Sequence, residues 1–167
     1  MVRRLIFPIL LVGLLVGLDQ WSKYLVETNL EYGVPVEVAP FFAFFRTYND
    51  GVSFSMFSGF GVTGLIAMST TVLAIVLWIW SKTERGRLLA HLGFALITAG
   101  AIGNLIDRAM LGVVIDFIQF HTDNWSFAIF NVADAYISVG VGAIVLDELL
   151  AWMNSRKTNQ KNREPHP

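Results

Sequence analysis

Two aspartates stand in unusually apolar surroundings, Asp116 in the segment VVIDFI and Asp134 in the segment FNVADAY. Two carboxyl groups brought close together do not both ionise readily, so one keeps its proton while the other acts as a base. Such a pair can activate water against an amide carbonyl and protonate the leaving amine, with no covalent intermediate and no cofactor. Asp116 and Asp134 are therefore the candidate catalytic residues of an acid–base hydrolase.

Composition indicates the elements that must position these aspartates. Of the 167 residues, 54% are hydrophobic and 15% are charged, whereas a soluble domain carries roughly a quarter charged residues. Four mostly apolar stretches are each long enough to cross a hydrocarbon layer of ~30 Å. They cover residues 5–24, 62–80, 88–106 and 132–152. The sequence therefore predicts a mostly α integral membrane protein with four transmembrane helices.

The first long connection differs in character from the four apolar stretches. The runs VPVEV, FFAFFRTY and VSFSMF are rich in β-branched and aromatic residues, and the tripeptide NDG at 49–51 is a turn signal. We expect residues 28–61 to form a small antiparallel β-sheet at the outer membrane surface, resting on the membrane interface. Residues 1–155 are predicted to be a single four-span domain, followed at 156–167 by a polar cytoplasmic tail that is disordered.

Basic residues are distributed unevenly among the ends and connections. Nine of the 12 lie in the N-terminus, in the connection 81–87 and in the C-terminal segment. The other three are Lys23, Arg46 and Arg108. Because cytoplasmic loops carry the excess of Lys and Arg, both termini and the connection 81–87 are predicted to be cytoplasmic. The connections 25–61 and 107–131 are predicted to face outward.

Polar residues inside the predicted spans converge on one depth. At 1.5 Å per residue, Asp19 lies about 21 Å into the first span and Asn104 about 24 Å into the third, and both spans run outward. Asp134 stands just inside the fourth span, which enters from outside, and Asp116 can reach the same level from its connection. Polar side chains at such depths are functional candidates by default. The sequence therefore predicts one polar cluster in the outer third of the membrane.

Several members of this cluster also have a structural interpretation. Asp19 and Lys23 are spaced i, i+4 and could form an ion pair on one helix face. Asn104 and Arg108 have the same spacing, and polar residues often hold membrane helices together. For these two residues and for Asp107, support of the site is favoured over chemistry.

The start of the fourth span also has a structural interpretation. Asn131 is a favoured helix-capping residue, and a carboxylate in the first turn, such as Asp134, is stabilised by the helix dipole. A single aspartate at this place would be structural as often as functional. What favours chemistry is the presence of two aspartates, Asp116 and Asp134, each in an apolar setting and each at one depth.

Other chemistries fit the sequence poorly. Cysteine is absent, which excludes disulfides and thiol catalysis. His91 and His121 fall on opposite sides of the membrane and are not expected to share a metal, and no glycine-rich phosphate loop is present. A Ser–Lys pair of Ser53 or Ser55 with Lys23 is possible, but no motif supports it. We therefore expect neither a metal nor a cofactor.

Five segments in order along the chain carry a family resemblance: DQWSK, NDGVSF, GNLIDR, VVIDFI and FNVADAY. Over nearly its whole length the chain resembles the bacterial lipoprotein signal peptidases, signal peptidase II. The resemblance implies an aspartic endopeptidase of the bacterial cytoplasmic (inner) membrane with its active site on the outer, periplasmic side. It also implies an enzyme that cleaves diacylglyceryl-modified prolipoproteins before the lipidated Cys and is inhibited by the cyclic peptide globomycin. We expect the enzyme to be a monomer.

The resemblance also assigns roles to individual positions. Asp116 and Asp134 match the catalytic dyad. The positions that would bind substrate or support the site are Asp19, Lys23, Asn49, Gly51, Asn104, Arg108, Asn131 and Ala133. The implied partners are prolipoprotein substrates and membrane lipid, and no nucleic acid. One position departs from the pattern: Tyr48 precedes Asn49 where many members have Arg, which bears on how substrate is clamped.

Two other classes of protein remain as alternatives. A small proton-coupled transporter or ion-conducting assembly would distribute polar residues through the full membrane depth. Here the inner two thirds of the second, third and fourth spans hold little beyond Ser, Thr and His91. A non-catalytic scaffold would tolerate replacement of Asp116 or Asp134. Cleavage of a lipidated lipobox peptide by the purified protein separates these classes from a peptidase.

Overall fold

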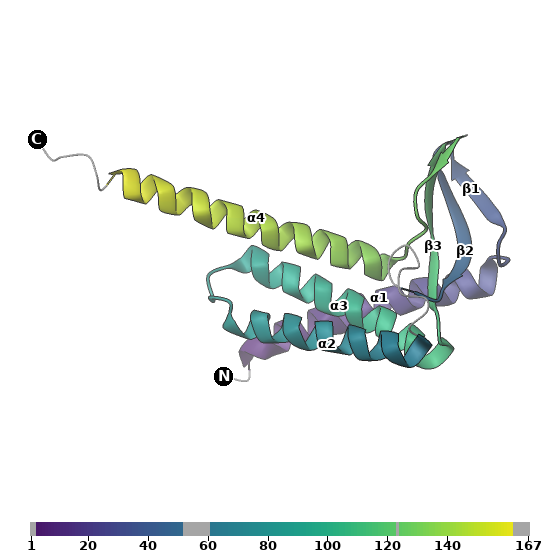
Figure 1. Cartoon of the computed structure of the whole chain (residues 1–167), viewed down its shortest axis with the longest axis horizontal. Helices are drawn as coiled ribbons and strands as arrows, with labels where there is room; N and C mark the ends of the chain where they lie inside the picture. The colour runs from purple at the N-terminus through teal and green to yellow at the C-terminus, as the bar shows by residue number, and fades with distance from the viewer. Residues whose placement is uncertain (1–2, 52–60, 123, 162–167) are drawn as a thin grey trace, which may run out of the picture.

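The computed structural model describes residues 3–51, 61–122 and 124–161 (Figure 1). Its long helices are α1 (Arg3–Asn29), α2 (Gly61–Lys82), α3 (Leu88–Leu111) and α4 (Val132–Lys161). Each contains a segment that is long and apolar enough to cross a membrane. The predicted four-span organisation is confirmed.

The outer surface of the helices is strongly apolar. Phe7 and Leu10 on α1 are 69% and 66% exposed, and Trp78 on α2 is 64% exposed. A soluble monomer rarely exposes apolar patches of this extent to water, whereas hydrocarbon imposes no such cost. These helices therefore present a surface that suits lipid, and the chain is a multi-pass membrane protein.

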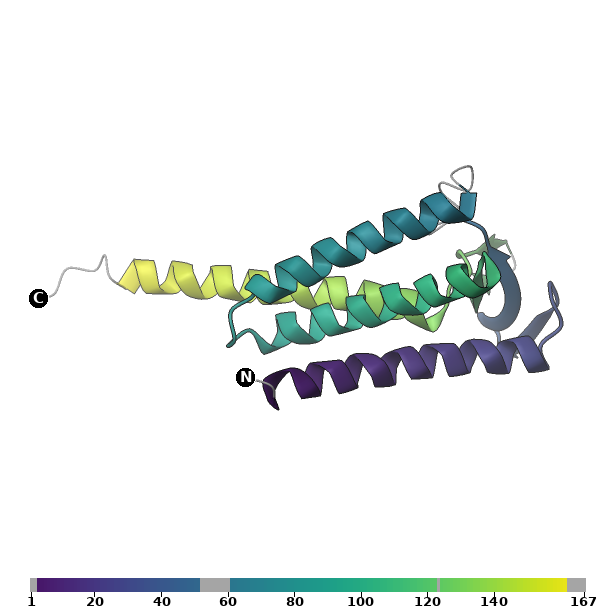
Figure 2. The same ribbon diagram turned by 90° about the horizontal axis from the view of Figure 1, so that it is seen from below.

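The helices alternate in direction. α1 and α3 run toward the sheet, and α2 and α4 run away from it (Figures 1 and 2). Both termini and the connection between α2 and α3 consequently lie at one end of the bundle, opposite the sheet. These two ends and this connection carry nine of the 12 basic residues. The sequence predicted that all three would lie on one side of the membrane.

Small residues let α3 and α4 pack closely. A Cβ added at Gly93 would lie 2.7 Å from the carbonyl oxygen of Gly140, and one at Gly140 would lie 2.6 Å from the carbonyl oxygen of Gly93. Nearer the sheet, a Cβ at Gly100 would overlap the carbonyl oxygen of Ala133. Glycine permits this approach because it has no side chain. The contact holds the first turn of α4, with Asp134, against the C-terminal half of α3.

An antiparallel sheet covers one end of the bundle, with strand order β1-β2-β3-β4. Its strands are β1 (Pro35–Ala39), β2 (Phe42–Asn49), β3 (Val114–Thr122) and β4 (Trp125–Ser126). β1 and β2 correspond to the runs VPVEV and FFAFFRTY, so the predicted small antiparallel sheet is confirmed. The run VSFSMF, also expected to be a strand, lies outside the described residues.

Half of the sheet comes from a segment that was expected only to be an outward connection. β3 and β4 lie within 107–131, and β3 pairs along β2 with Thr47 opposite Asp116. The sheet thus joins two connections that are far apart in the sequence. This pairing places Asp116 on a strand rather than on a loop.

Arg46 attaches the sheet to the C-terminal end of α1. Its Nη1 donates to the carbonyl oxygens of Glu27 at 3.0 Å and Leu30 at 3.1 Å. The last carbonyls of a helix have no intrahelical partner, so these bonds satisfy groups that would otherwise need water. Nη2 donates to the Tyr48 hydroxyl at 2.5 Å. Tyr48, the residue that departs from the family pattern, therefore binds Arg46 through its hydroxyl group, and both side chains lie on the same face of β2.

The C-terminal part of the chain differs from the sequence expectation. α4 continues to Lys161, so residues 156–161 are helical rather than a disordered tail. Lys, Arg, Gln and Asn do not interrupt a helix, and no Pro occurs between Val132 and Pro165. The Arg156 guanidinium lies 4.1 Å from the centre of the Trp152 ring, a cation–π contact within this extension.

Candidate active site

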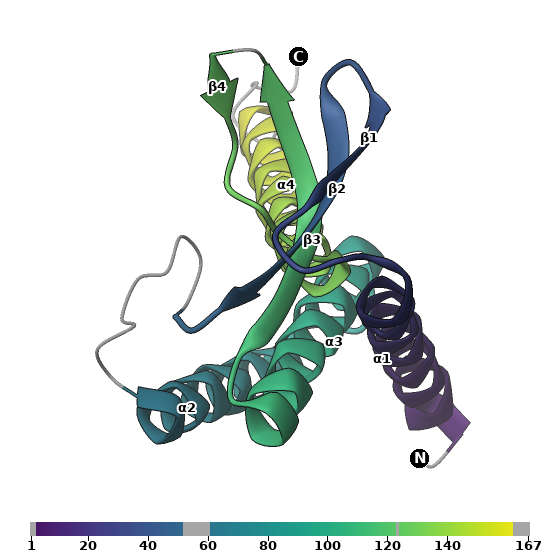
Figure 3. The same ribbon diagram turned by 90° about the vertical axis from the view of Figure 1, so that its right-hand side faces the viewer.

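β3 crosses over the sheet-facing end of the bundle, where α4 begins (Figure 3). Asp116 projects from β3 and Asp134 from the first turn of α4, so the two predicted catalytic residues come from different elements. Asp116 is 2% exposed. The close α3–α4 contact and the β2–β3 pairing together fix where these two elements meet.

Asn131 and Asp134 cap α4 reciprocally. The backbone N–H of Asp134 donates to Asn131 Oδ1 at 2.9 Å, and the backbone N–H of Asn131 donates to Asp134 Oδ2 at 3.2 Å. This is the capping-box arrangement, in which two otherwise unpaired N–H groups are satisfied at once. The cap predicted for Asn131 is confirmed, and it holds the Asp134 carboxyl in one orientation.

Three asparagines direct amide N–H groups at the two aspartates. Asp116 accepts from Asn49 Nδ2 at 3.0 Å and from Asn131 Nδ2 at 2.7 Å. Asp134 accepts from Asn104 Nδ2 at 2.8 Å. Asn131 therefore contacts both aspartates, one through its amide and the other through the helix cap.

The orientation of each amide is determined by a neighbour that can only donate. Asn49 Oδ1 accepts the backbone N–H of Gly51 at 3.0 Å, and Asn104 Oδ1 accepts from the Lys23 ammonium at 3.1 Å. Asn131 Oδ1 is held by the helix cap. Because these donors have no acceptor function, the amide nitrogens must face the aspartates. The aspartates are thus surrounded by donors, which suits carboxylate oxygens.

Burial dominates the acidity of Asp116. Loss of hydration, together with the neighbouring charge of Asp134, raises the pKa of Asp116 from 3.8 to about 7. The N–H groups of Asn49 and Asn131 and the charge of Lys23 oppose this rise. A carboxyl that titrates near neutrality is well placed to hold or release a proton during a reaction.

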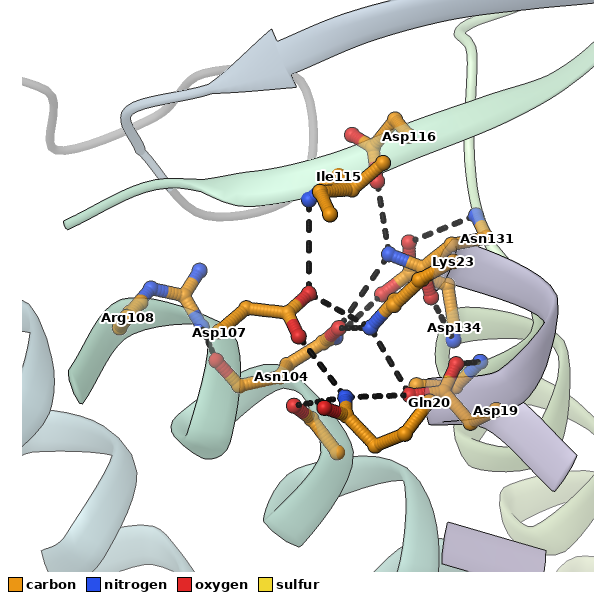
Figure 4. A network of polar contacts seen from close by, with 12 residues as sticks. Asp19, Gln20, Lys23, Asn104, Asp107, Arg108, Ile115, Asp116, Asn131 and Asp134 are labelled. Carbon is orange, nitrogen blue, oxygen red and sulfur yellow. Dashed lines mark hydrogen bonds and ion pairs between the residues drawn. The ribbon is translucent and has the colours of Figure 1, made fainter. Parts of the chain in front are cut away.

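A buried ionic group lies directly beneath the two aspartates (Figure 4). The Lys23 ammonium is 2.9 Å from Asp19 Oδ2 and 2.7 Å from Asp107 Oδ2. All three side chains are at most 3% exposed. The ion pair predicted for Asp19 and Lys23 is confirmed, but it is buried and has a second carboxylate. We call Asp19, Lys23, Asp107 and Gln20 the lysine cluster.

Gln20 completes the lysine cluster and was not identified from the sequence. Its Nε2 donates to Asp107 Oδ1 at 2.8 Å, and also approaches Asp19 Oδ2 and the carbonyl oxygen of Gly103 at 3.3 Å. A polar residue beside Asp19 in an apolar span was a local signal of this role. No local signal indicated that Gln20 would contact Asp107 on α3, because that contact joins two different helices.

Backbone groups and a glycine accommodate the lysine cluster. Ala133 is fully buried, and its N–H donates to Asp19 Oδ1 at 2.9 Å. A Cβ at Gly103 would overlap Asp19 Oδ2, so glycine is needed for the carboxylate to approach α3. On the other side of the site, Arg108 Nη2 donates to the carbonyl oxygen of Gly51 at 2.6 Å. All the residues that the sequence assigned to the site are thereby brought into one network.

A cavity of about 190 Å³ adjoins Asp134. It lies between α2, α3 and α4 and reaches the ends of β2 and β3. Its lining residues are Asn49, Met68, Ser69, Val72, Ala101, Asn104, Arg108, Val114, Asp134 and Ile137. The cavity is thus apolar on the α2 side and polar beside Asp134. A second cavity of about 360 Å³, between α1 and the sheet, is almost wholly apolar and contains no titratable side chain.

Two of the alternative chemistries can be compared with this geometry. Within residues 3–51, 61–122 and 124–161, no three His, Cys, Asp or Glu side chains gather in a metal-binding arrangement. The Lys23 ammonium is engaged by two carboxylates and an amide oxygen, which disfavours its use as a base for serine. Ser53 and Ser55 lie outside the described residues.

Four membrane-spanning helices, with the side chains of Asp116 and Asp134 close together at one end, define a multi-pass membrane protein. Residues 11–150 match the family model described as signal peptidase (SPase) II. A lipoprotein signal peptidase of Mesorhizobium japonicum is 56% identical over 86% of this chain and 85% of its own length. One of Brucella ovis is 47% identical over 93% of this chain and 98% of its own length.

Solved structures agree with these relatives. A bacterial membrane enzyme superposes with a TM-score of 0.78 at 28% identity, over 96% of this chain and 93% of that chain. A second superposes with a TM-score of 0.76 at 31% identity, over 86% and 92%. The chain belongs to the signal peptidase II family, as its five sequence segments indicated. It is a membrane enzyme that removes signal peptides from prolipoproteins.

Proposed function

We propose that this enzyme is an aspartic endopeptidase whose catalytic dyad is Asp116 and Asp134. Its substrates are diacylglyceryl-modified prolipoproteins, which it cleaves before the lipidated Cys. The observation that carries the proposal is the arrangement around Asn131, which contacts both carboxyl groups beside a cavity that Asp134 lines. A pKa of about 7 for Asp116 supports a dyad that holds one proton at neutral pH.

The dyad begins the reaction with one carboxyl protonated and the other ionised. The ionised carboxylate takes a proton from water while the water oxygen bonds to the scissile carbonyl carbon, and the protonated carboxyl gives its proton to the carbonyl oxygen. The resulting gem-diol then collapses. Its C–N bond breaks, the first carboxyl protonates the departing amine of the Cys, and the second regains a proton from a diol hydroxyl. The dyad returns to its starting state.

The supporting residues orient the dyad and bind the peptide. Asn49, Asn104 and Asn131 hold the carboxyl groups so that water can be placed between them. Arg108 lines the cavity, and its buried Nε has no hydrogen-bond partner among the residues that the structure describes. Because a guanidinium can only donate, Arg108 is suited to bind a carbonyl oxygen of the substrate backbone. Gly51 keeps Arg108 beside the cavity through its carbonyl group.

The proposed setting is the bacterial cytoplasmic (inner) membrane, with both termini in the cytoplasm and the dyad on the periplasmic side. The uneven distribution of basic residues supports this orientation. Residues 1–155 act as one domain, in contact with membrane lipid, and the enzyme works as a monomer because one chain supplies every residue of the dyad network. Family membership supports inhibition by globomycin.

The proposal is tested with purified full-length enzyme in detergent. We expect it to cleave a diacylated lipobox peptide, with mass spectrometry placing the cut immediately before the lipidated Cys. The same peptide without its diacylglyceryl group is the matched comparison and should be cleaved far more slowly. Absence of cleavage, or cleavage at another bond, would contradict the proposed function and favour a scaffold.

A further inference from the structure

The lysine cluster contacts the backbone next to both aspartates of the dyad. Asp19 Oδ1 accepts the N–H of Ala133, the residue before Asp134, at 2.9 Å. Asp107 Oδ2 accepts the N–H of Ile115, the residue before Asp116, at 3.4 Å. Each carboxylate of the cluster therefore holds the backbone N–H of the residue that immediately precedes one catalytic residue.

Lys23 joins these two carboxylates. Its ammonium lies 2.9 Å from Asp19 and 2.7 Å from Asp107 (Figure 4). Gln20 holds the other oxygen of Asp107 at 2.8 Å. Charge-assisted hydrogen bonds are short and directional, and the cluster is buried. A continuous polar connection thus runs from α4 through the cluster to β3.

Lys23 also reaches the dyad through a side chain. Its ammonium holds Asn104 Oδ1 at 3.1 Å, which turns Asn104 Nδ2 toward the Asp134 carboxyl at 2.8 Å. The Lys23 ammonium therefore orients the Asp134 carboxyl by way of Asn104. By way of Asp19, it also fixes the backbone beside Asp134. β3, which carries Asp116, is connected to this ammonium through Asp107.

We propose that Asp107 is a positioning residue that, with Lys23 and Asp19, sets the separation between the Asp116 and Asp134 carboxyl groups. This inference rests on the proposed function, since separation matters only if the two groups share a proton and a water. Two interacting carboxyls titrate as a pair, so their apparent pKa values depend on their distance. A purely structural ion cluster would affect how much enzyme folds, but not how the folded enzyme responds to pH.

The test uses Asp107→Glu, which keeps the charge but lengthens the connection to Ile115 by one methylene. We expect kcat for the diacylated lipobox peptide to fall about 10²-fold, the size of effect typical of an ångström-scale misplacement, with little change in KM. The two limbs of its pH–rate profile should also move relative to the wild type. Asp147→Glu is the matched control, because Asp147 is ion-paired with Arg87 at 2.5 Å in the middle of α4, away from the sheet.

Asp107→Asn, which keeps the size of the side chain, is measured alongside, and folded protein is quantified for every variant. A wild-type kcat and pH profile in Asp107→Glu would overturn the proposal. So would losses in both variants that match the loss of folded protein and leave the pH profile unchanged. Failure of the proposed function is distinguishable, because the wild-type enzyme would then not cleave the peptide before its Cys.

Discussion

At Asp116, burial and hydrogen bonding act on one carboxyl group in opposite directions. Burial favours the neutral form and raises the pKa of Asp116 to about 7, while the N–H of Asn49 favours the ionised form. A dyad with one shared proton loses that proton as the pH rises through the higher of its two pKa values. We therefore expect kcat/KM to decline on the alkaline side above about pH 7.

Asn49→Ala should move this alkaline limb to higher pH. The substitution removes a donor that stabilises ionised Asp116, so the pKa of the carboxyl rises and its proton is retained longer. A hydrogen bond to a charged group contributes roughly 1.5–3 kcal/mol, which corresponds to a shift of about one pH unit or more. The measurement is kcat/KM for the diacylated lipobox peptide between pH 4 and 10. Asn29→Ala, at the exposed end of α1, is the control, and an unmoved or lowered limb contradicts the assignment.

Individual residues differed in how far their roles could be predicted. Asp116 and Asp134 could be singled out as candidates because a carboxyl in an apolar segment is a local anomaly, and Asn131 as a cap because helix caps are local. Asp107 was assigned only a supporting role, and Gln20 was not identified. Their contacts with Lys23 and with each other cross from α1 to α3, and no spacing within one helix encodes them.

At the scale of elements, the α3–α4 contact depends on glycines that differ in their surroundings. A Cβ at Gly140 would meet the backbone of α3, whereas one at Gly142 would meet nothing within 4 Å. We expect Gly140→Ala to destabilise the enzyme by about 1–3 kcal/mol through overpacking. It should also lower turnover, because the first turn of α4 carries Asp134.

Gly142→Ala is the matched substitution on the same helix. Alanine has the higher helix propensity, so this variant should be neutral or more stable by up to ~1 kcal/mol. Thermal unfolding of both variants in detergent, compared with the wild type, makes the measurement. Equal melting temperatures for the two variants would mean that the close approach of α3 and α4 does not limit stability.

Helices and strands were not equally predictable. The four helices follow from apolar stretches of sufficient length, a property that each stretch possesses alone. β1 and β2 were indicated by β-branched and aromatic runs. β3 was not, because VVIDFI follows directly from an apolar helix, and its strand identity depends on pairing with β2, more than 60 residues away. The end of α4 was placed too early because polar composition does not by itself terminate a helix.

At the scale of the whole molecule, the charge distribution makes a prediction about orientation. The basic ends and the α2–α3 connection should be cytoplasmic, and the sheet with the dyad periplasmic. A reporter that is active only outside the cytoplasm should be inactive when fused after Pro167 and active when fused after Glu31. Activity after Pro167 would reverse the orientation and place the site on the wrong side for an exported lipoprotein.

The dyad is the central claim, and amide substitution tests it most directly. Asp116→Asn and Asp134→Asn each keep the size of the side chain but remove a titrating group. The control is Asp50→Asn, because Asp50 is close in sequence to Asn49 but exposed. Asp107 does not serve as a control, since its ion pair with Lys23 makes an amide there a change of buried charge.

The measurement is turnover of the diacylated lipobox peptide by each purified variant, with thermal stability recorded alongside. Each dyad variant should remain folded and lose at least ~10²–10⁴-fold in kcat, the range for a lost general acid–base step. The double variant should be little worse than either single one, because residues acting as a unit are not additive. Asp50→Asn should retain wild-type turnover. Near wild-type turnover in a folded Asp116→Asn or Asp134→Asn enzyme would contradict the account.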